Sequence, residues 1–324
     1  MDYMVSVIVP TYNHEKYIRK ALDSILMQEV PFLYEILIGD DASCDETQDI
    51  LHEYQERYPD KIRLFLHKEN IGATRNSYEL LTNAKGRYLA TLEGDDYWTD
   101  IHKLQIQVSF LEKHPEYIGC THKFTIVDEN DRPLKNQKLS WVKQKTVFVL
   151  QDFDGIIMPG QPSTFVRRNI FLNPKYDYSI CYRAHPMIAD RTLMLIFLLQ
   201  GNFYFINRCM GCYRKVVNHK SNNITSKQYL NNKNAIYEDF KILCKLEDYV
   251  FNKFNIYICF NTKKNYFFAY SVLGVLLGKN DIYTMVKILH NCSPSYKAIL
   301  SCPRNFAKVF IEHFKSKLFI ERSH

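Results

Sequence analysis

A cluster of carboxylates closes an apolar stretch near residue 90. The segment "YLATLEGDDYW", residues 88–98, runs from apolar side chains into Glu93, Asp95 and Asp96. Three carboxylates within four residues repel one another unless a cation or a charged substrate offsets them. Oxygen ligands with open coordination positions suit Mg²⁺ or Mn²⁺ better than zinc. The segment therefore predicts a divalent-cation site.

Two more polar clusters follow short apolar runs earlier in the chain. Residues 10–13 read Pro-Thr-Tyr-Asn, and residues 40–43 read Asp-Asp-Ala-Ser. Taken alone, each cluster has a second interpretation as a helix cap, made by Asn13 in the first case and by Asp41 or Ser43 in the second. Ligand binding and helix capping both stay open for these residues.

The elements that must position these clusters alternate along the chain. Short apolar runs predict strands, and segments with apolar residues three or four apart predict helices. Right-handed crossovers then give an α/β fold with a mainly parallel sheet covered on both faces. Such sheets bind ligands at the carboxyl ends of their strands, so all three clusters are expected at one edge. The predicted strands are 5–9, 36–39, 62–66 and 88–92, and the predicted helices are 17–26, 45–58 and 73–84.

Length and composition bound the class of protein. A chain of 324 residues with 46% apolar content can bury a large core, as one sizeable domain plus an appendage. It opens without a signal-peptide pattern and has no apolar run of the roughly 18 residues that a spanning helix needs, so we expect a cytoplasmic protein. Its nine cysteines are then expected to be reduced. Cys209 and Cys212 form a CxxC without a second ligand pair, which favours packing thiols.

Three segments together carry a resemblance to a known family. "VSVIVPTYNHEKYIRKALDSILMQ", "EILIGDDASCDET" and "NIGATRNSYELLTNAKGRYLATLEGDDYW" follow one another in this order. They resemble the nucleotide-binding half of inverting family-2 glycosyltransferases with the glycosyltransferase-A fold, over about residues 4–113. The resemblance implies a Rossmann-like catalytic domain over 1–220, with a nucleotide-binding half (1–113) and an acceptor half (114–220), and a helical region over 221–324. It implies sugar transfer from a nucleotide-diphosphate sugar, with uridine as the expected base.

The resemblance also assigns roles to single residues. Asp95 takes the place nearest the metal, Asp96 shares or orients that role, and Glu93 replaces an Asp that contacts the ribose. Arg75 offers a second positive group near the leaving phosphate, or is a solvent-facing helical arginine. The residues that the resemblance places around the nucleotide are Pro10, Thr11, Tyr12, Asn13, Asp41, Arg75, Glu93 and Gly94.

An inverting displacement needs a general base on the face opposite the leaving group. The family usually supplies an Asp at the start of an apolar helix that precedes a "YR" strand. "HPMIADRTLMLIFLLQGNFYFINRCMGCYRK" has this layout, with Asp190 ahead of the apolar run and Tyr213-Arg214 after it. The resemblance therefore implies that Asp190 is the base, with His185 as the second choice. The alternative for Asp190 is a carboxylate that the helix dipole favours, worth about 0.3–1 kcal/mol.

The acceptor side is expected between these halves. "MPGQPSTFVRRNIF", residues 158–171, resembles the strand and loop that form the acceptor wall. Gln161, Ser163 and Thr164 then bond sugar hydroxyls, or they are simply exposed loop residues. His219, after the "YR" strand, takes a phosphate or metal contact by the same resemblance.

The last hundred residues differ in composition. An Asn/Lys-rich segment after residue 221 predicts a linker, followed by helices over 229–249, 266–277, 282–290 and 306–318. The net charge of +7 includes a basic tail from residue 297 onward, which suits an anionic membrane surface or equally a solvated helix face. No nucleic-acid-binding motif accompanies the charge. The basic residues of this tail are Lys297, Arg304, Lys308, Lys315, Lys317 and Arg322.

Two functions stay open at this point. The first is a Mn²⁺- or Mg²⁺-dependent transferase that adds a sugar to a saccharide or lipid-linked saccharide, a setting that by family analogy is a capsule, lipopolysaccharide or other surface glycan. The second is a nucleotide-sugar-binding protein of the same fold whose catalysis has decayed. A nucleotidyltransferase is disfavoured because no Gly-rich, Lys-containing loop follows the first strand.

Overall fold

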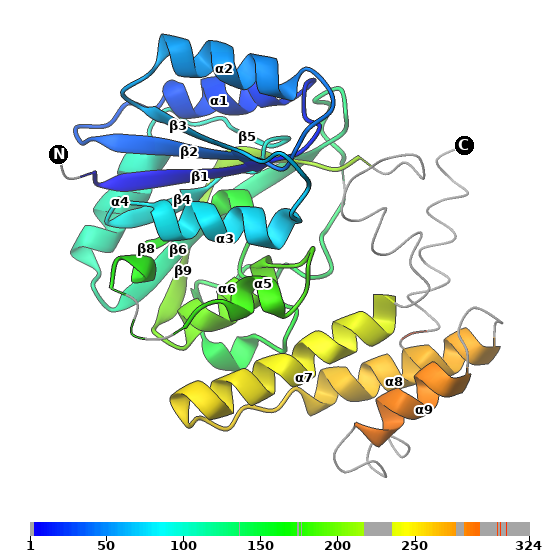
Figure 1. Ribbon diagram of the computed structural model, residues 1–324. Coiled ribbons are helices and arrows are strands. Elements are labelled where there is room, and N and C mark those ends of the chain that lie inside the picture. The colour runs from blue at the N-terminus through cyan, green and yellow to red at the C-terminus, as the bar shows by residue number, and fades with distance from the viewer. Residues whose placement is uncertain are drawn as a thin grey trace. The chain divides into compact units, whose positions relative to one another are not determined.

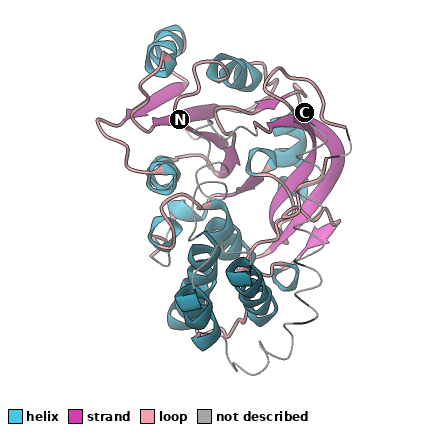
Figure 2. Cartoon of the chain, turned by 90° about the vertical axis from the view of Figure 1, so that its right-hand side faces the viewer, coloured by secondary structure: helices cyan, strands magenta, loops and turns pink. Residues whose placement is uncertain are grey.

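The chain divides into two compact units, 1–216 and 217–324. The computed structural model describes residues 3–135, 137–173, 175, 177–216, 235–276, 282–291, 303, 305 and 309. The first unit contains a mixed, mainly parallel sheet with helices, and the described part of the second unit contains helices and no strand (Figures 1 and 2).

The first four strands of the chain are parallel to one another and lie side by side in the order β3-β2-β1-β4. From β1 the chain moves outward across the sheet to β2 and β3, and it then returns past β1 to β4. Because the direction reverses, α3 covers the face of the sheet opposite α1 and α2 (Figure 1). Every element predicted in this part is confirmed, with ends shifted by no more than a few residues. The bounds are β1 Val5–Thr11, α1 Ile18–Leu26, β2 Tyr34–Asp40, α2 Thr47–Arg57, β3 Ile62–Leu66, α3 Ala73–Asn83 and β4 Tyr88–Thr91.

The sheet continues beyond β4. The resemblance implied a strand within residues 158–171 and a "YR" strand, which match β8 and β9, whereas β5, β6 and β7 were not predicted. The full order is β3-β2-β1-β4-β8-β6-β9-β5, with β8 antiparallel to both of its neighbours and β6 parallel to β9. The bounds are β5 Tyr97–Trp98, α4 Lys103–Lys113, β6 Tyr117–Val127, β7 Val147–Phe148, η1 Leu150–Asp152, η2 Pro162–Thr164, β8 Val166–Arg168, η3 Ile170–Leu172, α5 Ile180–Arg183, α6 Asp190–Leu198 and β9 Asn202–Arg214.

The core lies between the sheet and its helices. Val7 and Val9 of β1 and Ile36 and Ile38 of β2 are fully buried, and the apolar side of α1 packs against them. Burying such a side chain stabilises the fold by about 1.5–3 kcal/mol. A strand covered on both faces is apolar throughout, which explains why these runs do not alternate with polar residues.

The second unit contains α7 (Ala235–Phe254), α8 (Asn261–Leu276) and α9 (Ile282–His290). The first three predicted helices of this region are confirmed, and the fourth, over 306–318, lies outside the described residues apart from Val309. The basic tail residues named above also lie outside them. Within the described ranges, no helix combines the length and the apolar character needed to cross a membrane.

Candidate functional site

The three polar clusters meet at one edge of the sheet, as the sequence predicted. Thr11, the last residue of β1, pairs with Asp40, the last residue of β2. The Asp41 N–H donates to the Thr11 carbonyl at 3.1 Å, and the Gly94 N–H donates to the Pro10 carbonyl at 3.2 Å. The loops after β1, β2 and β4 are therefore bonded to one another directly.

The loops after β1 and β2 are joined by side chains that were open to interpretation as helix caps. The Asn13 Oδ1 accepts the Cys44 N–H at 2.9 Å, and the Asn13 N–H donates to the Ser43 Oγ at 2.8 Å. The N-cap residues of α1 and α2, Tyr17 and Glu46, make no side-chain cap bond, and the side chain that accepts the first N–H of α2, from Thr47, is that of Asp45 at 3.0 Å. The capping interpretation is wrong for Asn13, Ser43 and Asp41, because each bonds to another loop or within its own loop instead.

Asp41 holds the loop that leads into α3. Its carboxylate oxygens accept the N–H groups of Ile71 at 2.7 Å and Gly72 at 3.1 Å. Burial raises the pKa of Asp41, and the two backbone bonds oppose that rise. Gly72 has φ +92°, a conformation that side chains rarely adopt, and a Cβ there would lie 3.2 Å from the Pro186 carbonyl.

The acidic loop after β4 contains one carboxylate that is fully engaged. The Asp96 Oδ1 accepts the Arg214 N–H at 2.8 Å, and its Oδ2 accepts the Gln161 Nε2–H at 2.8 Å and the Ser163 O–H at 2.6 Å. Asp96 is only 1% exposed. Among the described residues, no hydrogen bond reaches the carboxylate of Asp95. Asp96 therefore fixes the loop, and the Asp95 side chain takes no part in these bonds.

Four carboxylates share this part of the site. Burial raises the pKa of Glu93 well above its usual range, and the charges of Asp96, Asp95 and Asp190 add to the rise. Burial and Asp95 do the same for the pKa of Asp96. The same four carboxylates add to the effect of burial in raising the pKa of Tyr213. Asp190 thus lies close enough to the acidic loop to act on it, although the two are far apart in sequence.

Asp190 is the first residue of α6, and the loop before it is tied to α3. The Thr74 hydroxyl and N–H donate to the Pro186 carbonyl at 3.0 and 3.4 Å. In the same loop, the Nδ1 of buried His185 accepts the Met187 N–H at 3.1 Å. A neutral His185 then carries its proton on Nε2, so the ring presents a donor there, which suits a base less well than a carboxylate.

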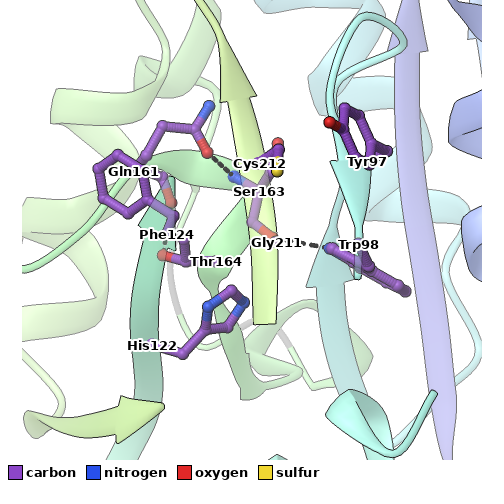
Figure 3. A pocket seen from close by; sticks show the side chains of 9 residues that line it. All are labelled: Tyr97, Trp98, His122, Phe124, Gln161, Ser163, Thr164, Gly211 and Cys212. Carbon is purple, nitrogen blue, oxygen red and sulfur yellow. Dashed lines mark hydrogen bonds between the residues drawn. The ribbon is translucent and has the colours of Figure 1, made fainter. Parts of the chain in front are cut away.

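Gln161 and Ser163 were predicted to face a sugar or to be exposed loop residues. Both are at least 96% buried, so exposure is excluded. The Ser163 Oγ accepts the Glu93 N–H at 3.1 Å while donating to Asp96, and the Gln161 Oε1 accepts the Ser163 N–H at 2.7 Å. They line a narrow pocket behind the acidic loop (Figure 3). Its lining residues are Tyr97, Trp98, His122, Phe124, Gln161, Ser163, Thr164, Gly211 and Cys212.

Arg214 is a site residue that the sequence reasoning treated only as a landmark. Its buried guanidinium donates to the Asp95 carbonyl at 2.8 Å, to the Asp128 carbonyl at 2.9 Å and to the Asp131 carboxylate at 2.7 Å. It also stacks 4.4 Å from the ring centre of Tyr17. The side chain fixes the backbone of Asp95 from the far end of β9, a contact that no local pattern reveals.

Two further predicted residues have clear surroundings. Arg75 is exposed in the first turn of α3, with its guanidinium 5.3 Å from the ring centre of Tyr182. At Gly94, a Cβ would fall 2.7 Å from the Thr11 Oγ1 and from the His14 Nδ1. Position 94 therefore excludes a side chain because the loops pack closely. His219 lies outside the described residues.

The donor atoms fit a cation that is shared with a substrate. Across the described ranges, no three His, Cys, Asp or Glu side chains are grouped so that protein ligands alone could hold a metal ion. Cys209 and Cys212 are free thiols on β9. Mg²⁺ is commonly bound through one or two carboxylates plus substrate phosphates. Asp95 beside the carboxyl edge of the sheet matches that arrangement.

A mixed, mainly parallel sheet between layers of helices, with an acidic loop at its carboxyl edge, defines this chain as an α/β protein. The family model for glycosyl transferase family 2 matches residues 6–172, which is more than half of the chain. The chain belongs to this family.

Several relatives and one solved structure are similar to this chain over part or most of its length. An uncharacterised protein of Mycobacterium tuberculosis is 36% identical over 212 residues, 65% of this chain and 58% of that protein. The chain thus spans less than two thirds of the length of this relative. The putative teichuronic acid biosynthesis glycosyltransferase TuaG of Bacillus subtilis is 38% identical over 122 residues, 38% of this chain and 46% of TuaG. Residues 1–349 of S. aureus TarS, crystallised with UDP-GlcNAc, share the fold with a TM-score of 0.64 at 16% identity, covering 96% of this chain and 92% of that one.

Proposed function

We propose that the chain is a metal-dependent, inverting glycosyltransferase that moves a sugar from a UDP-sugar to a saccharide or lipid-linked saccharide during surface-polysaccharide synthesis. The observation that carries the proposal is the meeting of Asp41, Asp95 and Asp190 around one sheet edge. The first of these follows β2, the second follows β4, and the third begins α6. Family membership, the name of TuaG and the ligand of TarS support the same function.

The donor is bound by the carboxyl edge of the sheet. The loops after β1 and β2, with Pro10, Thr11, Tyr12 and Asp41, form the nucleotide side of the site. Asp95 would hold Mn²⁺ or Mg²⁺, which when bound stabilises negative charge on the departing diphosphate. Arg214 holds the backbone of Asp95, so the carboxylate is positioned before the donor arrives.

Asp190 acts on the acceptor side. Its carboxylate takes the proton of the attacking hydroxyl while that oxygen bonds to the anomeric carbon and the sugar–phosphate bond breaks. Because attack and departure occur on opposite faces, the anomeric configuration inverts. Asp190 lies in the first turn of α6, where the helix dipole favours a negative charge.

Turnover of candidate nucleotide sugars tests the proposal. We expect release of UDP from one of a panel of UDP-sugars in the presence of Mn²⁺, and loss of that release when a chelator is added. A thermal shift measured with each donor identifies the ligand independently, because a donor at 100 times its Kd adds about 2.7 kcal/mol to stability. Donor binding without turnover for any acceptor would instead support the binding-only function.

We further propose that the second unit contacts an anionic membrane surface, where a lipid-linked acceptor would be held. Residues 217–324 contain 16 Lys and Arg against 7 Asp and Glu, a net charge of +9, so the remaining residues carry −2 of the total of +7. Described side chains of this unit also expose apolar surface, including Tyr257 at 81%, Tyr283 at 66% and Ile282 at 64%. Basic charge beside exposed aromatic and aliphatic groups suits a lipid headgroup region.

Vesicle co-sedimentation tests this second proposal. The full chain should pellet with vesicles containing phosphatidylserine, and raising the salt from 0.1 M to 1 M should release it because screening shortens the Debye length from about 10 Å to 3 Å. Pelleting with purely zwitterionic vesicles to the same extent would contradict a charge-driven contact.

A further inference from the structure

The amide of Gln161 bridges two carboxylates of the acidic loop. Its Nε2 lies 2.8 Å from the Glu93 Oε2 and 2.8 Å from the Asp96 Oδ2. The two oxygens can therefore be no more than 5.6 Å apart, twice 2.8 Å. Gln161 is 1% exposed, so water does not take part in screening this contact.

Carboxylates this close repel each other in a buried setting. A lysine or arginine in this place would cancel their charge and leave less attraction for a cation. An amide donates two hydrogen bonds while remaining neutral, so it holds the oxygens together and keeps the negative charge of the loop intact. Gln161 is therefore matched to a loop that must stay negative.

The bridge is itself held in place. The Gln161 Oε1 accepts the Ser163 N–H at 2.7 Å at the start of η2, which fixes the orientation of the amide. The Ser163 hydroxyl then supplies a second bond to Asp96 at 2.6 Å. Both donors come from one short turn, so the turn acts as a preformed support for the loop.

We infer that Gln161 is a positioning residue for the divalent cation: it holds Glu93 and Asp96 in the geometry in which Asp95 receives the metal. This inference rests on the proposed function, since it assumes that the acidic loop binds a cation. Residues that orient metal-binding groups typically contribute 10–100-fold to metal affinity when they are removed.

The test compares two buried glutamines. Gln161→Met removes the bridge at nearly constant volume. Gln28→Met is the matched control, because Gln28 is also buried and its Nε2 donates to two carbonyls, of Asp100 at 2.8 Å and Ser24 at 3.4 Å, while its Oε1 accepts the Leu104 N–H at 3.0 Å. Each substitution thus removes two donated bonds and one accepted bond, but only the first removes them from carboxylates.

Mn²⁺ binding is measured directly by electron paramagnetic resonance with UDP present, on the full chain. We expect the Mn²⁺ Kd to rise by about 10–100-fold in Gln161→Met and to stay within twofold in Gln28→Met. Gln161→Leu, which also removes the bridge, serves as the second variant if Gln161→Met does not fold, and Ser163→Ala, which keeps the bridge, should give a smaller rise than either. Equal Mn²⁺ affinity in the wild type and in the Gln161 variant that folds would overturn the inference. A wild type that binds no Mn²⁺ would overturn both this inference and the metal dependence in the proposed function. Mn²⁺ binding without sugar transfer would contradict only the proposed function.

Discussion

Acidic residues lie at the end of β2 and shortly after the end of β4, the two strands beside β1, but the two loops are built differently. After β2, the carboxylates of Asp40 and Asp41 have separate partners: the first accepts from Ser43 and Gln48, and the second from Ile71 and Gly72. After β4, by contrast, the carboxylates of Glu93 and Asp96 share the amide of Gln161. The difference shows that acidic neighbours in sequence become a charged site only when their hydrogen bonds converge.

The consequence is a division of roles between the two loops. Neutral donors of the chain itself hydrogen-bond both carboxylates of the β2 loop, so this loop joins β2 to α3 in addition to its proposed place beside the nucleotide. The carboxylates of the β4 loop still repel one another, since burial and neighbouring charge raise the pKa of both Glu93 and Asp96. A cation relieves that repulsion, so the two loops should respond differently to substitution, metal and pH.

The largest effect is expected at Asp95. Asp95→Asn should lower sugar transfer by a factor on the order of 10³, because the diphosphate loses its metal-borne stabilisation. The Tm should hardly change, since no hydrogen bond among the described residues depends on this carboxylate. Initial rates at saturating Mn²⁺ measure the loss of transfer, and thermal unfolding followed by circular dichroism measures the Tm. Retained activity would show that the β4 loop does not hold the metal through Asp95.

The next effect concerns the base. Asp190→Asn should lower transfer by a factor on the order of 10² or more, while the affinities for donor and Mn²⁺ stay near those of the wild type. The same rate assay, combined with calorimetric titration of UDP, separates these quantities. Lost UDP binding would place Asp190 in the nucleotide pocket, and normal turnover would return the role of base to His185. The product anomer, read by NMR, should be inverted relative to the donor.

A smaller effect, on stability, is expected in the β2 loop. Asp41→Asn places an amide N–H against one of the two backbone donors, of Ile71 or Gly72, so one buried bond is lost. The cost is about 1–3 kcal/mol, measured as the free energy of unfolding in urea. Asp49→Asn, in the exposed first turn of α2, is the control and should change stability by less than about 1 kcal/mol. An unchanged unfolding free energy in Asp41→Asn would contradict the structural role of this loop.

The smallest effect is a dependence of stability on pH that comes from Glu93 in the β4 loop. Because the folded-state pKa of Glu93 is raised, the folded chain binds more protons than the unfolded chain above pH 4–5, so metal-free stability falls as pH rises through the folded pKa. Glu93→Gln should remove part of this loss and raise the Tm at pH 8 by about 2–4 °C, equivalent to roughly 1 kcal/mol. Scanning calorimetry from pH 5 to 8 without metal measures it. The exposed Glu56→Gln is the control, and a Tm of Glu93→Gln that tracks the wild type at every pH would contradict the prediction.

The sequence was sufficient to predict the first half of the fold. Strands β1, β2 and β4 are buried on both faces and β3 is a half-buried edge strand, yet each contains a short, mostly apolar run that can be recognised locally. Strands β5 and β8 have two and three residues, too few for any periodicity to register. Their places in the sheet depend on pairing with segments far along the chain, which a local pattern does not contain.

The candidate site divides in the same way. The acidic loop follows a local apolar run, and the resemblance to the family supplies the layout around α6, so Asp95 and Asp190 could be proposed from the sequence. Gln161 and Arg214 could not be assigned their contacts, because they bond to Asp96 across 65 and 118 residues. A polar residue in a loop gives no local sign of whether it meets water, a sugar or a distant carboxylate.

The strand order also affects the time at which the site can form during synthesis. β8 lies between β4 and β6, and the acidic loop leads from β4 to β5, which pairs with β9 at the other end of the sheet order. The nascent chain must therefore extend to Arg214 before the last partner of Asp96 exists. Contacts between segments this far apart form late, since the ordering entropy must be met first. A ribosome-bound chain that ends near residue 113 would possess the strands of the nucleotide-binding half, while its acidic loop would still be without the groups that fold it.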